Sequence, residues 1–76
     1  MTRATAETIW GADVVRLALD ESEHEPITEA LLSAIQRQAD PPGAFRAWAL
    51  SQSWPRFCAI VRVVAGVIHE EEEDNG

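Results

Sequence analysis

Short apolar runs, separated by polar residues, prolines and glycines, follow one another along the chain, and within each run the apolar positions recur at helical spacing. The pattern predicts a first helix from Ala6 to Leu19, with Thr5 as its N-cap. Its polar stripe is narrow on a helical wheel, and the apolar Ile9 shares that stripe with Asp13 and Arg16. Such a helix is either central to its domain or offers a second apolar face to a partner.

The second helix is expected to begin at Pro26, because proline suits the first helical position. Glu25, or a capping box formed by Ser22 with Glu25, precedes it. The helix should end before Pro41, since the residue preceding a proline is pushed out of the helical region. One buried face is indicated by a regular apolar stripe of Ile27, Ala30, Leu31, Ala34 and Ile35.

Two more helices are expected in the second half of the chain. One follows Asp40 as N-cap and runs to about Leu50, and the other runs from near Trp54 to about His69. The stretch Phe57 to Val64 is rich in valine and isoleucine, so it also suits a buried strand. We favour a helix, because no other segment alternates apolar and polar residues and a lone strand leaves its backbone groups unpaired.

These elements predict an all-α fold, a small bundle of three to four short helices in residues 1–69. The acidic tail of residues 70–76 is expected to be disordered in the free protein. A chain of 76 residues buries only about 60% of its unfolded surface, so its helices must pack regularly or bury surface against a partner. The predicted core positions are Ile9, Trp10, Val14, Leu17, Leu31, Ile35, Phe45, Trp48, Phe57, Ile60, Val61 and Val64.

Acidic residues outnumber basic ones by 13 to 6, which gives a net charge of -7, and they gather in two blocks, residues 20–29 and 70–74. Direct nucleic-acid binding is not expected, because both blocks repel phosphate. A protein partner with a basic surface is favoured instead. The residues expected to contact it are Asp20, Glu21, Glu23, Glu25, Glu29, Trp54, Arg56, Glu70, Glu71, Glu72, Glu73 and Asp74.

The three tryptophans divide into two kinds. Trp10 and Trp48 are expected in the core, whereas Trp54 starts a helix beside Arg56 and is expected to be partly exposed and available to a partner. Tryptophan and arginine are enriched among the residues that dominate binding energy at protein interfaces. Trp54 and Arg56 are therefore included in the predicted contact surface.

The sequence gives no catalytic residues, metal ligands or cofactor motif. Cys58 lies in an apolar run and is expected to be a buried hydrophobe; it is also too far along one helix from His69 for the two side chains to meet. The spacing Glu21-x-x-His24 occurs in di-metal helices, but here it lies in a polar break that suits a solvated turn better.

No stretch reaches the roughly 20 apolar residues that span a bilayer. The single cysteine and the lack of an apolar export signal favour the cytoplasm.

These features predict a non-enzymatic protein-binding module. The most specific version of this prediction is a small inhibitor that occupies a basic, nucleic-acid-binding groove of its partner. Phage anti-CRISPR and anti-restriction proteins act in this way, and the analogy with them is one of charge and size. The alternative is a structural subunit that forms homodimers through spare apolar surface of the first and fourth helices, where Ala59 and Gly66 allow close approach. The acidic blocks also suit a simple solubilising role.

Overall fold

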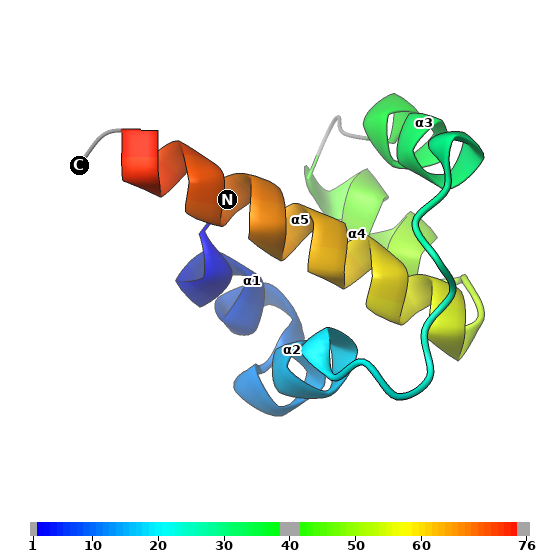
Figure 1. Cartoon of the computed structure of the whole chain (residues 1–76), viewed down its shortest axis with the longest axis horizontal. Coiled ribbons are helices and arrows are strands. Elements are labelled where there is room, and N and C mark those ends of the chain that lie inside the picture. The colour runs from blue at the N-terminus through cyan, green and yellow to red at the C-terminus, as the bar shows by residue number, and fades with distance from the viewer. Residues whose placement is uncertain (1, 39–41, 75–76) are drawn as a thin grey trace.

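Five helices make up the part of the chain that the computed structural model describes, residues 2–38 and 42–74 (Figure 1). No strand occurs in these two ranges, so the all-α class is confirmed, and Phe57 to Val64 is helical. Three to four helices were expected, and the additional one arises because the first predicted helix is divided in two. The helices are α1 (Arg3–Trp10), α2 (Ala12–Leu19), α3 (Glu29–Arg37), α4 (Pro42–Leu50) and α5 (Trp54–Asp74).

The division between α1 and α2 lies at Gly11. Its φ of 95° and ψ of 143° belong to a backbone region that residues with a side chain rarely adopt. The Gly11 N–H closes α1 by donating to the carbonyl of Glu7 at 2.7 Å, and the Gly11 carbonyl opens α2 by accepting from Val15 at 3.1 Å. The prediction of one continuous helix from Ala6 to Leu19 with Thr5 as its N-cap was therefore wrong. The N-cap is Thr2, whose hydroxyl accepts from the Thr5 N–H at 3.0 Å.

α3 begins at Glu29, three residues later than predicted. Thr28 is its N-cap, and the Thr28 hydroxyl accepts from the backbone N–H of Leu31 at 3.2 Å. Pro26 lies outside the helix, because residues 24–28 cross from α2 to α3 without regular secondary structure.

Of the predicted stripe, Leu31 and Ile35 are buried and Ala34 is partly buried. Ile27 precedes the helix and is 43% exposed, and Ala30 is exposed, so these two positions were wrong. The helix ends before Pro41, as predicted.

α4 ends at Leu50, as predicted, while its expected cap Asp40 lies outside the described residues. α5 begins at Trp54, also as predicted, and continues beyond His69 to Asp74. Glutamate has good helix propensity, and extending an existing helix avoids the cost of nucleation, so the helix reaches into the acidic tail. The disorder expected for the tail in the free protein stays a prediction.

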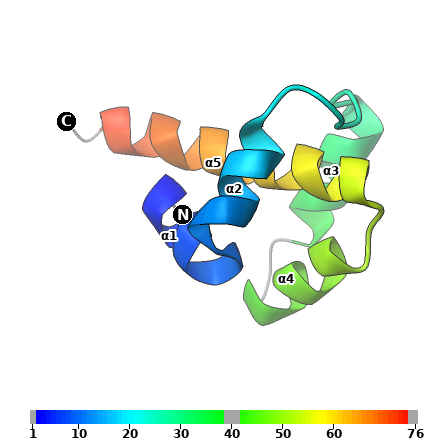
Figure 2. The same ribbon diagram turned by 90° about the horizontal axis from the view of Figure 1, so that it is seen from below.

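α5 runs along the molecule, and the other helices gather around its N-terminal two thirds (Figures 1 and 2). α2 makes the most extensive helix-to-helix contact with α5, followed by α1, while α4 packs against it more lightly. Trp10 joins three helices, because its ring meets Phe57 edge-on at 6.0 Å and Phe45 at 6.4 Å between centroids. These T-shaped and tilted arrangements are favourable for aromatic pairs.

The predicted core is largely confirmed. Seven of its positions are buried: Trp10, Leu31, Ile35, Phe45, Phe57, Ile60 and Val61. Ile9, Val14, Trp48 and Val64 are partly buried and pack against that cluster. The prediction that Leu17 lies in the core was wrong, because this residue is 53% exposed. The break at Gly11 turns α2 about its axis relative to a continuous helix, so Val15 and Ala18 face α5 in place of Leu17.

Candidate interaction site

The acidic stretch, defined here as residues 20–29, leads from the end of α2 to the first turn of α3. All five of its carboxylate residues are exposed, namely Asp20, Glu21, Glu23, Glu25 and Glu29. Glu25 is 3.7 Å from Arg56, whereas the other four form no ion pair within the described part of the chain. No arginine side chain offsets the charge of these four carboxylates within the described part of the chain, so this edge of the molecule is negative.

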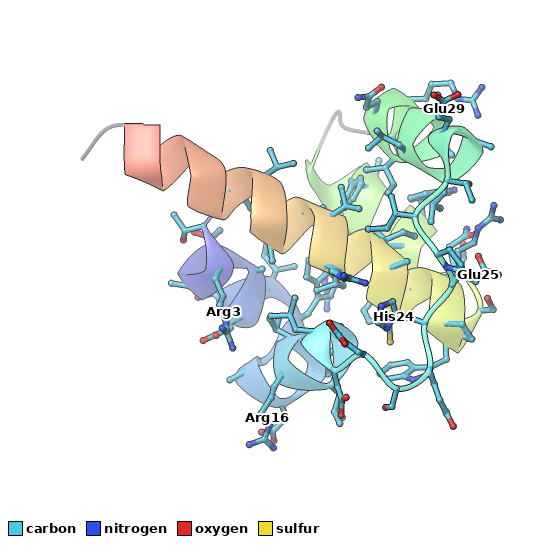
Figure 3. The ribbon with its side chains drawn as sticks, in the orientation of Figure 1. Arg3, Arg16, His24, Glu25 and Glu29 are labelled. Carbon is cyan, nitrogen blue, oxygen red and sulfur yellow. The ribbon has the colours of Figure 1, made fainter. Side chains whose placement is uncertain are left out.

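Three contacts hold the middle of the acidic stretch against α5. The backbone N–H of Glu25 donates to the carbonyl of Pro55 at 3.2 Å. Arg62 donates to Nε2 of the half-buried His24 at 2.5 Å, and Arg56 lies beside the Glu25 carboxylate. Figure 3 shows His24 turned toward α5, while Glu25 and Glu29 lie along the outer edge. These contacts hold the chain at His24 and Glu25 against α5, in the middle of the acidic stretch.

Trp54 stands at the start of α5 and is 47% exposed, as predicted. Its ring stacks on Phe57, with 5.7 Å between centroids and 26° between planes. Because Phe57 is itself buried, the stack fixes one face of the tryptophan and leaves the rest of the ring toward solvent. The other two tryptophans differ as expected, since Trp10 is buried and Trp48 is partly buried in the core.

A hollow of about 160 Å³ connects the acidic stretch with Trp54. Its lining comes from the end of α2, the following turn and the start of α5: Leu17, Asp20, Ser22, Glu23, Trp54 and Cys58. Cys58 is only 2% exposed, as expected of a buried hydrophobe. Desolvation raises the pKa of the Cys58 thiol above its ordinary value, so this residue is uncharged at neutral pH. The lining therefore combines an apolar side with two carboxylates.

The structure separates the two acidic blocks that were grouped in one predicted contact surface. Residues 70–74 form the last turns of α5, at the end of the molecule away from the acidic stretch (Figures 1 and 2). Asp20, Glu23 and Trp54 come together, and Glu25 joins Arg56 nearby. Sequence reasoning missed Leu17 and Cys58 as part of this surface, because both were assigned to the interior and only the folded chain brings them to the hollow.

Of the groups considered for chemistry, Glu21, His24 and Cys58 have side chains that the structure describes, and the side chain of His69 lies outside them. Glu21 and His24 are in the turn and linker after α2, and His24 is occupied by Arg62. Among the side chains that the structure describes, in residues 2–38 and 43–68, no three histidine, cysteine, aspartate or glutamate residues converge as metal ligands do. Within the described ranges 2–38 and 42–74, every helix is too short or too polar to cross a bilayer.

Comparison with known proteins gives no relative. No protein-family model matches the chain, and no curated protein and no solved structure is significantly similar to it.

Proposed function

We propose that this protein is a non-enzymatic binding module of the cytoplasm whose acidic stretch docks on a basic surface of a partner protein. The observation that carries the proposal is a group of four exposed carboxylates, Asp20, Glu21, Glu23 and Glu29, which have no ion-pair partner among the described residues. They lie on a segment that contacts α5, next to the exposed ring of Trp54. Where the basic surface of the partner serves to hold nucleic acid, docking there makes the protein an inhibitor.

Fixed carboxylates favour association for two reasons. They belong to a segment that the contacts to Pro55 and Arg62 already hold at Glu25 and His24, so its backbone there loses little conformational freedom on binding. They also raise the rate of encounter with a positive surface, an effect that weakens as salt shortens the Debye length from about 10 Å at 0.1 M. The second acidic block, Glu70 to Asp74, contributes to this long-range attraction from the far end of α5.

The proposal is tested by affinity purification from the native cell lysate with quantitative mass spectrometry. The first variant carries Asp20→Asn, Glu21→Gln, Glu23→Gln and Glu29→Gln, which removes four charges from the acidic stretch. The control variant removes four charges from the tail by changing each of Glu70, Glu71, Glu72 and Glu73 to Gln. We expect the first variant to lose its basic partners and the control to keep most of them.

Other outcomes of this experiment would contradict the proposal. Equal recovery of the same basic partners by the wild type and the first variant, or recovery that is unaffected by salt, contradicts docking through the acidic stretch. Equal losses in both variants mean that net charge, and not this surface, attracts the partner.

A second function, self-association, is favoured by exposed apolar side chains on the two elements predicted for it. Leu17 on α2 is 53% exposed and Val67 on α5 is 49% exposed, and Gly66 beside Val67 has open space around it. Ala59, which was expected at the same interface, is fully buried within the chain and cannot contribute. Light scattering of the purified protein decides the matter, since a monomer at all concentrations contradicts a homodimer.

A further inference from the structure

The hollow beside Trp54 is the place where the acidic stretch and an exposed aromatic ring meet. Asp20 and Glu23 line it together with Trp54, and Leu17 adds a largely exposed aliphatic side chain. Both apolar side chains are about half exposed, Trp54 at 47% and Leu17 at 53%. Interfaces are enriched in tryptophan.

Three arginines on neighbouring helices have partners of their own, and the first of them, Arg16, pairs with Asp13 at 3.6 Å. Arg62 is bonded to His24, and Arg56 lies against Glu25. Neither Asp20 nor Glu23 has an ion-pair partner within the described residues, and the Cys58 thiol adds no charge. The hollow therefore keeps two uncompensated negative charges beside a π face, which is complementary to a cation.

We infer that the hollow receives one arginine side chain from the partner protein, with its guanidinium between the Trp54 ring and the carboxylates of Asp20 and Glu23. The inference rests on the proposed function and names the group that the acidic stretch recognises. A guanidinium is planar, so it stacks on an indole ring while its edges donate to carboxylates in a forked arrangement. Leu17 then contacts the methylenes of the arginine stem.

Other occupants fit the lining less well. A lysine ammonium is a compact, strongly hydrated charge that neither stacks on a ring nor forms forked pairs with carboxylates. An apolar side chain would pack against Trp54 and Leu17 but would desolvate Asp20 and Glu23 without pairing them, which is unfavourable. The hollow of about 160 Å³ is several times the roughly 10–15 Å³ that one water needs on a comparable measure, so it has room for a guanidinium.

Calorimetric titration with arginine, lysine and citrulline nonapeptides at low salt tests the inference. Citrulline keeps the shape of arginine but has no charge. We expect the arginine peptide to bind more tightly than the lysine peptide, and the citrulline peptide to bind weakly. Trp54→Leu keeps an apolar group against Phe57 but removes the π face, and it should weaken arginine-peptide binding about five- to tenfold.

Two double variants with equal charge separate the hollow from the remainder of the acidic stretch. Asp20→Asn with Glu23→Gln removes the carboxylates of the hollow, and Glu21→Gln with Glu29→Gln removes two that lie outside it. The first pair should weaken arginine-peptide binding at least about fivefold more than the second, because only the first removes groups that touch the guanidinium. Circular dichroism of each variant confirms that the helices are intact.

The outcomes distinguish this inference from the proposed function. If arginine and lysine peptides bind equally, and both double variants weaken them equally, the acidic stretch attracts cations but the hollow has no arginine site. Wild-type affinity of Trp54→Leu for the arginine peptide also overturns the inference. If the unmodified protein binds neither basic peptide at low salt, both the inference and docking through the acidic stretch are contradicted.

Discussion

Replacing Gly11 with alanine tests the architecture at its least expected point. The φ of 95° is accessible to glycine, and an alanine held there costs about 1–3 kcal/mol. Alanine also restricts the unfolded chain, which returns about 0.4–1 kcal/mol. No atom lies within 4 Å of an added Cβ, so no steric clash contributes. We therefore expect Gly11→Ala to lower the free energy of unfolding by about 1–2 kcal/mol.

Gly66 provides the matched control. It lies inside α5, is exposed, and also has open space around an added Cβ. Alanine in a helix interior is more favourable than glycine by about 0.5–1 kcal/mol, so Gly66→Ala should stabilise the protein. The two variants should differ by about 2 kcal/mol, or about 8–16 °C in Tm for a domain of this size.

Thermal and urea unfolding followed by circular dichroism measure both changes. A stabilisation by Gly11→Ala equal to that by Gly66→Ala refutes the reasoning. It would mean that one helix runs through Gly11, which would turn Val15 and Ala18 away from α5.

Three further predictions concern single side chains. Thr28→Ala should destabilise the protein by about 1 kcal/mol in urea unfolding, because it removes the hydroxyl that caps α3; an unchanged midpoint would place the start of α3 elsewhere. The chain has no tyrosine and its basic residues are all arginine, so apart from the α-amino group Cys58 is the group that titrates in mild alkali. Burial raises its folded pKa above the unfolded value, so the stability that it contributes is complete below about pH 8.5 and is lost as pH rises further. The Cys58→Ala variant should lack this loss as the pH rises above about 8.5, and an equal loss in both proteins contradicts the assignment. Trp54→Leu should change the free energy of unfolding by less than about 1 kcal/mol, since about half of the side chain is exposed to water. A larger decrease in that free energy, measured by urea unfolding, would mean that Trp54 belongs to the core.

Sequence pattern alone predicted the elements whose stability depends on local periodicity. The stripe of Leu31 and Ile35 and the helical spacing of Phe57, Ile60 and Val61 predicted buried positions, and the structure buries these residues. Val64 is partly buried. An isolated glycine weakens a helix by only about 1 kcal/mol, so the pattern around Gly11 did not reveal a break. The misplacement of Leu17 followed from that single error.

The candidate site was less predictable, because it depends on contacts between segments distant in the sequence. The exposure of Trp54 followed from its position between Ser53 and Pro55 at a helix start. The hollow could not be predicted in this way, because it forms only where the end of α2 lies beside the start of α5. The pairing of His24 with Arg62, which fixes the acidic stretch, likewise has no local signal.

A chemical-shift map of the isotope-labelled protein tests the central claim most directly, by titration with the arginine nonapeptide at about 0.05 M and about 0.5 M salt. At low salt the shifts should concentrate in residues 17–29 and at the Trp54 indole, and at high salt they should fade. Shifts centred on the last turns of α5, or shifts that persist unchanged at high salt, would contradict docking through the acidic stretch.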